Sequence, residues 1–355
     1  MKYYFYKKEK KEIKPVEDDA LNLEAKEKIE QMLKEPEKHN IPSWVLRCDH
    51  VALFQSKGNL AKANALYIVD KECVYDMSNS LNDLSSKEWL PETVTVFAQK
   101  GLGAGSSEAK IERQHPAPYS FQDVARHIRF FTKEGEYVLD PFVGVGSTLK
   151  AACVENRKGL GIELNPKYAE LAKLRIETEL PLLMDYKDQQ QVICGDSLTV
   201  LQTIEDNTFD FVMTSPPYWN ILDTVDNKAK QREEEELDTK YSDSENDLAN
   251  IPDYHDFLIK LSDVFIECAR TLKDGKYMAI VVSDFRKSDK YFMFHSDLAS
   301  MLEERSSLVL KGIKILYQRH KSIYPYGYPF SFVPNVHHQY VLILRNEKGG
   351  KNGKK

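Results

Sequence analysis

The sequence has few cysteines and no long apolar run. Its 355 residues include only five cysteines, which stand far apart and never form a C-x-x-C pair. This pattern argues against a disulfide framework or a cysteine zinc site, and it is typical of a reducing compartment. No apolar stretch approaches the ~20 residues of a membrane-spanning helix, and the N-terminus lacks a signal-peptide pattern. We therefore expect a cytoplasmic protein without a membrane segment.

The sequence also lacks an excess of positive charge. It has 49 Lys and Arg against 55 Asp and Glu, which gives a formal net charge of −6. Whole-chain charge therefore gives no support for nucleic-acid binding, and any such function must depend on local patches. The hydrophobic share of 42% is that of a globular chain with an ample core.

Short apolar strands alternate with helices beyond about residue 110. Seven strands are expected at 137–139, 159–164, 191–194, 209–213, 277–283, 312–317 and 339–345. This alternation predicts an α/β fold with a doubly wound, mostly parallel sheet. Because little between the last two strands has a helical pattern, we expect them to pair antiparallel at one edge.

The regular pattern defines one expected domain, residues 111–346, and leaves three other segments. Residues 1–110 form an N-terminal extension with a Lys/Glu-rich start. Residues 220–250 are polar, with the charge run Arg232–Glu236, and are expected to be a mobile loop. The Gly/Lys-rich tail 347–355 is expected to be disordered.

A strand, a glycine turn and a helix start follow one another at 138–148, VLDPFVGVGST. Such a turn brings the backbone close to a ligand, and the helix N-terminus offers free N–H groups. Leu149 stands where a dinucleotide fingerprint has its third glycine, and no G-K-[ST] is present, so the turn suits a nucleoside without a pyrophosphate. Glu163, 17 residues past Gly146, ends the next strand and is placed to accept both ribose hydroxyls. An ordinary strand–turn–helix with an exposed acid is the alternative.

A second strand ends in a polar residue, two prolines and two aromatics at 209–219, FDFVMTSPPYW. The prolines remove N–H donors and stiffen the backbone, which leaves carbonyls and the serine hydroxyl to face a cleft. Such a cleft accepts hydrogen bonds from an amino group while an aromatic ring stacks on a flat base. In a doubly wound sheet, this segment and the glycine turn share the carboxyl edge, where ligands bind. A rigid surface turn is the alternative.

In their chemistry, these motifs resemble those of S-adenosylmethionine-dependent DNA amino-methyltransferases, the N4-cytosine and N6-adenine type. Asp140–Thr148 is similar to the family's cofactor loop, D-P-F-x-G-x-G-[ST]-[TS], and Thr214–Trp219 to its catalytic S-P-P-[YF] box. Glu163 matches the ribose-binding acid, and Gly195–Ser197 matches the segment that binds adenine. His115–Phe121 resembles the segment that leads into a helix beneath the methionine end of the cofactor.

The resemblance implies a seven-stranded, Rossmann-like methyltransferase sheet with S-adenosyl-L-methionine as cofactor. The cofactor-binding residues it implies are His115, Pro118, Asp140, Phe142, Gly144, Gly146, Ser147, Thr148, Glu163, Asp196 and Ser197. The catalytic residues it implies are Ser215, Pro216, Pro217 and Tyr218.

The expected reaction is methyl transfer to an exocyclic amino group. The Ser215 hydroxyl and the Pro216 carbonyl would accept the two N–H bonds of that group, and in-line transfer would depend on positioning and preorganisation. Tyr218 would stack on a target base flipped out of the duplex. Trp219 would either stack as well or pack. Neither a metal ion nor a covalent nucleophile is needed.

A Pro/Gly-rich loop at 318–332 interleaves basic and aromatic residues and is suited to phosphates and bases. An aromatic loop that packs over the core is an equal alternative. Candidate DNA-binding residues are Trp219, Arg319 and Lys321, and the segments 1–110 and 220–250 are candidates for sequence recognition. Double-stranded DNA is the expected partner and a cognate restriction endonuclease is a candidate partner, with the oligomeric state left open.

Cytosine N4 is the favoured target, because adenine enzymes of this type mostly have Asp or Asn where this chain has Ser215. N6-adenine methylation, RNA base methylation and a catalytically silent DNA-binding subunit are the alternatives. The cofactor loop precedes the catalytic box here, an order permuted relative to many members with S-P-P-Y.

Overall fold

The structure is a computed structural model, and the chain in it divides into two compact units. These are residues 1–94 with 132–134, and residues 95–131 with 135–355. The structure describes residues 2–7, 12–15, 23–36, 38–39, 41, 43–47, 50–54, 66–70, 73–99, 109–112, 114–115, 120–180, 186–219, 247–319 and 321–349.

The first unit contains a five-stranded sheet that the sequence did not predict. Its strand order is β2-β1-β3-β4-β5. The strands are β1 (Lys2–Lys7), β2 (Glu12–Pro15), β3 (His50–Phe54), β4 (Leu66–Asp70) and β5 (Cys73–Asp76). The unit also contains α1 (Leu23–Lys34) and α2 (Ser86–Glu92), and a capping box between Ser85 and Glu88 starts α2.

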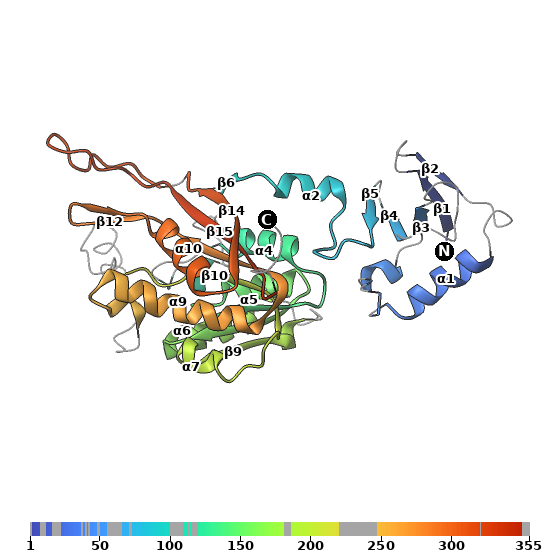
Figure 1. The fold of residues 1–355 in the computed structure, drawn as a ribbon, viewed down its shortest axis with the longest axis horizontal. Coiled ribbons are helices and arrows are strands. Elements are labelled where there is room, and N and C mark those ends of the chain that lie inside the picture. The colour runs from blue at the N-terminus through green and yellow to red at the C-terminus, as the bar shows by residue number, and fades with distance from the viewer. Residues whose placement is uncertain are drawn as a thin grey trace. The chain divides into compact units, whose positions relative to one another are not determined.

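The second unit is built on an eight-stranded sheet with the order β6-β14-β15-β11-β10-β7-β8-β9 (Figure 1). Only β15 runs antiparallel to its neighbours in this sheet. The strands are β6 (Val96–Ala98), β7 (Tyr137–Asp140), β8 (Lys158–Glu163), β9 (Gln190–Cys194), β10 (Phe209–Thr214), β11 (Leu272–Val282), β14 (Leu308–Tyr317) and β15 (His338–Asn346).

This sheet confirms the predicted α/β, mostly parallel class and corrects two details. It has eight strands rather than seven, because β6, from within the expected N-terminal extension, pairs parallel with β14. The last two strands do pair antiparallel, but β15 lies inside the sheet, and β6 and β9 are its edges.

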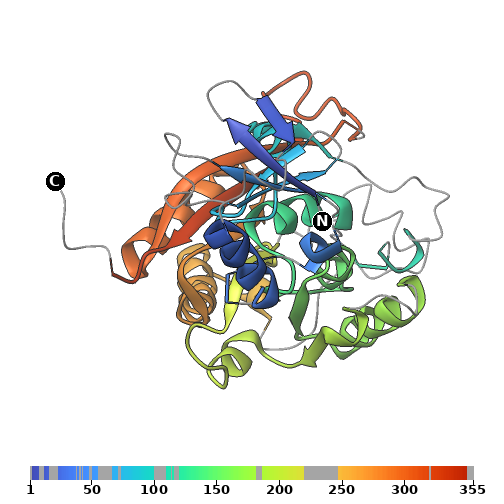
Figure 2. The same ribbon diagram turned by 90° about the vertical axis from the view of Figure 1, so that its right-hand side faces the viewer.

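In the described part of the second unit, six helices pack on the sheet in two sets (Figures 1 and 2). Contacts link α4, α5 and α6 in one set and α7, α9 and α10 in the other. The helices are α4 (Phe121–Phe131), α5 (Ser147–Val154), α6 (Pro166–Glu179), α7 (Ser197–Leu201), α9 (Tyr254–Thr271) and α10 (Phe294–Arg305). The short helix α3 (Ala109–Glu112) precedes them. Asn165 caps α6 and Pro166 begins it.

Two projections leave the sheet at the edge where β10 and β11 end. The hairpin β12 (Phe285–Lys287) and β13 (Lys290–Phe292) follows β11 directly. Because β15 is antiparallel, its first residues pair with the last residues of β11, as Tyr340 does with Val282. The long connection from β14 to β15 therefore emerges at the same edge.

Several expected features concern segments that the structure describes only in part. Of the polar loop 220–250, residues 220–246 lie outside the described residues, as do residues 350–355 of the tail. Within the tail, the Lys348 backbone N–H donates to Asp274. Among the described residues, no helix is long and apolar enough to cross a membrane.

Candidate active site

A cavity of about 420 Å³ lies where the parallel strands β7, β8 and β10 end. This volume is within the ~300–1,000 Å³ of small-molecule sites. The predicted residues that line it are His115, Phe142, Glu163, Asp196, Ser197, Ser215, Pro216 and Pro217. The fold thus brings the glycine-turn motif and the Ser-Pro-Pro segment to one site.

The two glycines of the turn serve its backbone geometry. Gly144 and Gly146 have φ values of +53° and +83°, which L side chains rarely adopt. The Gly144 N–H donates to Glu163 Oε2 at 2.9 Å. A Cβ on Gly146 would lie only 3.2 Å from the Cβ of Ala172. The turn therefore orients the acid at the cavity and lets α5 start close to α6.

Asp140 links three segments of the site. It is fully buried, and its Oδ1 accepts hydrogen bonds from Thr214 Oγ1 at 2.6 Å and the Phe142 N–H at 3.0 Å. Its Oδ2 accepts from Thr148 Oγ1 at 2.5 Å. Because Thr214 precedes Ser215, this carboxylate connects the glycine turn to the Ser-Pro-Pro segment. Asp140 and Thr148 are placed as positioning residues, and neither lines the cavity.

The side chain of Ser147 is held inside the protein by a buried ion network. Arg175, with no exposed surface, donates to Ser147 Oγ at 2.9 Å, Glu112 Oε2 at 2.9 Å and Glu179 Oε2 at 3.0 Å. Lys150 also pairs with Glu179, at 2.8 Å. Burial raises the pKa of Glu112, while Arg175 acts to lower it. The network joins α3 to the start of α5 through Arg175, which lies on α6. The sequence pattern of α6 did not indicate this role for Arg175.

Glu163 is the acid that faces the cavity. Besides the Gly144 bond, its Oε1 accepts the Asn165 N–H at 2.8 Å. Burial raises the pKa of Glu163 to about 7, and Asp140 and Asp247 add to the rise, while the two backbone bonds oppose it. Its protonation state therefore changes near neutral pH.

Binding of S-adenosyl-L-methionine should weaken as the pH falls through about 7, because protonation of Glu163 removes acceptor capacity for ribose hydroxyls. Glu163→Gln should bind the cofactor roughly tenfold more weakly, the scale of a hydrogen bond to a charged group, and should lose this pH dependence. Calorimetric titrations on either side of neutrality measure both effects. An affinity of Glu163→Gln equal to that of the parent would contradict the assignment.

The stability of the unliganded protein should show the opposite trend with pH. The pKa of Glu163 is about 7 in the folded protein against an ordinary 4.5, so the free energy of unfolding should fall as the pH rises from 4.5 to about 7.

Asp196 and Ser197 begin α7 beside the cavity. Asp196 Oδ1 accepts from the Thr199 N–H at 2.9 Å and from Thr199 Oγ1 at 2.8 Å, while its Oδ2 has no partner among the described residues. Ser197 Oγ donates to the Pro141 carbonyl at 2.5 Å. His115 lines the cavity edge-on to Tyr168, with ring centroids 4.9 Å apart, whereas Pro118 lies outside the described residues.

The predicted catalytic box continues the buried strand β10. Ser215 Oγ donates to the Val281 carbonyl at 3.1 Å and is also hydrogen-bonded to the Tyr218 hydroxyl, which leaves one lone pair to accept a further hydrogen bond. Pro216 and Pro217 line the cavity, whereas Tyr218 does not. The Tyr218 hydroxyl accepts from Gln339 Nε2 at 3.3 Å. Burial raises the pKa of Tyr218 to about 12, so this phenol stays protonated at neutral pH.

The predicted DNA-contact residues have different surroundings. Trp219 is 8% exposed, packs on Tyr254 and donates its indole N–H to the Ile251 carbonyl at 2.8 Å. It therefore packs in the core, which is one of the two alternatives that the sequence left open for this residue. Arg319 is exposed, and Lys321 Nζ donates to the Val336 carbonyl at 3.1 Å.

Sequence reasoning missed part of the cavity lining. The additional lining residues are Pro141, Leu164, Tyr168, Leu198, Thr199, Asp247, Leu248, Ile251, Lys260 and Val264. Pro141, Leu164, Leu198 and Thr199 lie next to or near predicted residues, and their positions at strand ends or helix starts could have identified them. Lys260 and Val264 share one face of α9, and nothing local in the sequence marks that face as part of the site.

The doubly wound sheet, the glycine turn and the acids at its carboxyl edge define a Rossmann-like α/β protein that binds a nucleoside-type ligand. The chain belongs to the N6/N4 DNA methyltransferase family, whose model, described as DNA methylase, matches residues 1–174 and 209–352.

Curated relatives match shorter segments. The type II methyltransferase M.BglI of Bacillus subtilis is 36% identical over 97 residues, which is 27% of this chain and 26% of that protein. The type II methyltransferase M2.DpnII of Streptococcus pneumoniae is 34% identical over 108 residues, 30% of this chain and 36% of that one. These alignments thus span well under half of either relative. Among solved structures, an S-adenosylmethionine-dependent methyltransferase from Methanosarcina mazei has 14% identity and a TM-score of 0.39, covering 61% of this chain and 94% of that chain.

Proposed function

We propose that the protein is a site-specific DNA methyltransferase that transfers a methyl group from S-adenosyl-L-methionine to an exocyclic amino group in duplex DNA. One observation carries this proposal: Ser215 and Pro216 line the same cavity as Glu163 and Asp196. The cavity thus combines acceptors for an amino group with acceptors for a nucleoside. Membership in the N6/N4 DNA methyltransferase family supports the same activity.

The residues present fit S-adenosyl-L-methionine. Glu163 faces the cavity with a carboxylate suited to ribose hydroxyls, and Asp196 Oδ2, which has no partner among the described residues, suits the adenine amino group. His115 lines the same cavity and is the proposed contact to the methionine end. When bound, this cofactor supplies a methyl group on a positively charged sulfonium. The cavity presents the acceptors that a nucleoside needs.

The protein's part in the reaction is to orient the target amino group. The Ser215 hydroxyl uses its proton on the Val281 carbonyl, so its oxygen acts as an acceptor. Pro216 has no N–H, and its backbone can contribute only a carbonyl acceptor. Two acceptors on one amino group draw its nitrogen toward tetrahedral geometry, with a lone pair available for in-line transfer.

Cytosine N4 is the proposed target atom, with adenine N6 as the alternative. A neutral serine hydroxyl at the first position of the box supports cytosine, since a smaller pyrimidine can lie close to the Pro216 carbonyl. A restriction–modification setting, with a cognate endonuclease, is part of the proposal because the relatives above are type II methyltransferases.

The direct test is mass spectrometry of nucleosides. Purified protein with S-adenosyl-L-methionine and unmethylated plasmid should produce N4-methylcytosine in the DNA, and structured RNA in a parallel reaction should stay unmodified. N6-methyladenine instead would contradict the choice of base. Methylation of RNA alone, or of neither polymer, would overturn the proposed function.

A further inference from the structure

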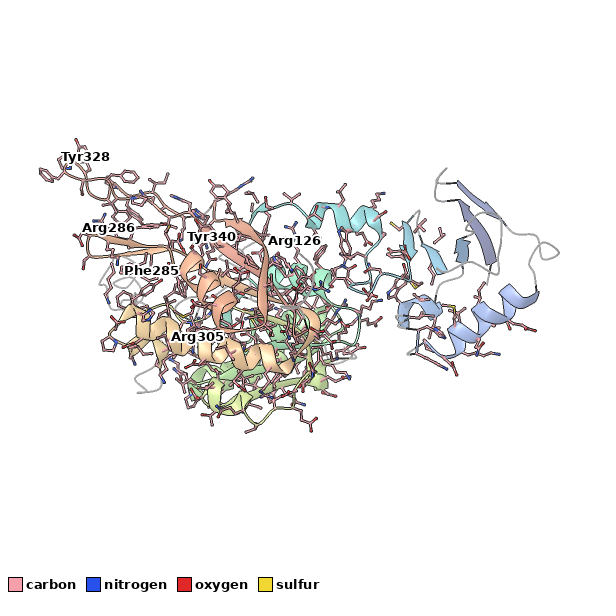
Figure 3. All side chains as sticks on the ribbon, viewed as in Figure 1. Arg126, Phe285, Arg286, Arg305, Tyr328 and Tyr340 are labelled. Atoms are coloured by element: carbon pink, nitrogen blue, oxygen red, sulfur yellow. The ribbon has the colours of Figure 1, made fainter. Side chains whose placement is uncertain are left out.

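The connection between β14 and β15 carries strongly exposed aromatic side chains. Tyr328, Phe330 and Phe332 are 81%, 93% and 87% exposed, and we call these three residues the aromatic tip. Figure 3 shows Tyr328 at the far end of this connection. The loop therefore does not pack over the core, which was one of the two alternatives that the sequence left open. Three large aromatic rings in solvent on one short segment favour a binding function.

The aromatic tip is part of a defined turn. Below it, the Tyr324 N–H donates to Asn335 Oδ1 and Asn335 Nδ2 donates to the Tyr324 carbonyl, both at 2.9 Å. At the turn, the Phe330 N–H donates to the Gly327 carbonyl at 2.8 Å. Gly327 has φ +76°, and a Cβ there would lie 2.3 Å from the Ser331 carbonyl oxygen. The backbone therefore holds the rings outward before any partner binds.

The base of this connection adjoins the catalytic box. Gln339 is the second residue of β15. Its side-chain amide donates to the Tyr218 hydroxyl, and its Oε1 accepts a hydrogen bond from Gln318 Nε2 at 3.3 Å. The β12–β13 hairpin, where Figure 3 labels Arg286, projects from the same edge of the sheet. A polymer bound at the cavity would meet both projections.

Local charge favours a polyanion as the occupant. Residues 306–346 contain no Asp or Glu, although the whole chain has a net charge of −6. Of the basic residues in that stretch, Arg319 and Lys321 lie at the base of the connection. Lys311 and Arg345 lie at the other ends of β14 and β15, where both pair with Glu347, and Lys314 is buried. The β12–β13 hairpin adds Arg286, Lys287 and Lys290 against one acid, Asp289. Like charge opposes a second copy of this face, whereas the phosphates of DNA complement it.

We propose that the aromatic tip inserts into the base stack of duplex DNA beside the target base and occupies the space that this base leaves when it flips out. The proposal rests on the proposed function. Extrusion of a base costs unstacking and unpairing energy, and aromatic rings that stack on the neighbouring bases offset part of that cost. The aromatic tip is then a positioning element for the flipped state, and Arg319 is placed to contact phosphate nearby.

The test compares substrates that differ only in how easily the target base leaves the helix. The target site is first located by sequencing the methylated plasmid, and two short duplexes are made, one fully paired and one with an abasic site opposite the target base. The combined Tyr328→Ser, Phe330→Ser and Phe332→Ser variant should lose about tenfold or more in kcat/KM on the paired duplex, given the strength of base–aromatic stacking. It should recover most of this loss on the abasic-opposed duplex and bind S-adenosyl-L-methionine as the parent does.

Two control variants separate insertion from general effects. Leu174→Ser removes an apolar side chain that is 45% exposed on α6, and it should leave both rates unchanged. Phe330→Trp with Phe332→Trp keeps large rings at the tip and should retain activity on the paired duplex.

The outcomes distinguish the two proposals. Parental kcat/KM of the serine variant on the paired duplex, or an equal loss on both duplexes, overturns insertion while the methyltransferase proposal stands. A change in oligomeric state on sedimentation with unchanged DNA kinetics assigns the aromatic tip to self-association and also overturns insertion. Absence of DNA methylation by the parent protein overturns both proposals.

Discussion

Ser215→Ala should lower the rate of methyl transfer about 10²-fold, the effect of removing one preorganised hydrogen-bonding group from a reaction centre. The hydroxyl proton of Ser215 is used on the Val281 carbonyl, so the lost atom is the acceptor that faces the cavity. The affinity for S-adenosyl-L-methionine should change little, because Glu163 and Asp196 remain. Single-turnover methylation of unmethylated DNA and calorimetric cofactor binding measure the two quantities.

Ser306→Ala is the matched control for this experiment. Ser306 also donates its hydroxyl to a backbone carbonyl, that of Leu302 at 2.6 Å, but it lies at the end of α10 and does not line the cavity. Its variant should methylate DNA at the parental rate. If Ser215→Ala also keeps that rate, the reaction centre lies elsewhere.

Asp140→Ala should lower the free energy of unfolding by about 3 kcal/mol or more, since each buried polar group left without a partner costs ~1–3 kcal/mol. The substitution removes the acceptor of the fully buried Thr148 and Thr214 hydroxyls and of the partly buried Phe142 N–H. Cofactor affinity and turnover should both fall, because the same carboxylate positions the glycine turn and the strand that carries Ser215. Urea unfolding measures the stability change at constant pH.

Asp188→Ala provides the comparison, because Asp188 is exposed in a short 3-10 helix. Its effect on unfolding should stay within about 0.5 kcal/mol, as for most surface substitutions. A parental midpoint for Asp140→Ala would show that this carboxylate does not hold the site together.

Features that depend on a few neighbouring residues could be predicted from the sequence. The glycine turn requires positive φ at Gly144 and Gly146, and Pro166 marks the first residue of a helix. Glu163 ends β8, and in a parallel sheet such an end must lie at the ligand-binding edge. These inferences led to the cavity because each depends on local backbone conformation and strand direction.

The tertiary structure changed the interpretation of several individual side chains. Asp140, Ser147 and Thr148 carry the motif, yet their polar atoms bond to Thr214, Arg175 and Asp140 within the protein. A motif shows which residue types occur together, and it does not tell whether a side chain faces the ligand or supports a neighbour that does. Trp219 is a second case, since its indole N–H is bonded to Ile251, 32 residues away.

The sequence by itself determined the class of the fold, the order of its central elements and the residues that meet at the carboxyl edge, because glycine, proline and apolar periodicity act on the local backbone. Only the tertiary structure decided that β6 pairs with β14 about 220 residues later, as Val96 does with Ile315, and that β15 lies inside the sheet. It also decided that Trp219 is buried while Phe330 is exposed, although both are aromatic residues near proline. Strand pairing and burial depend on contacts between residues far apart in the chain, and no local pattern specifies which partner each residue will meet.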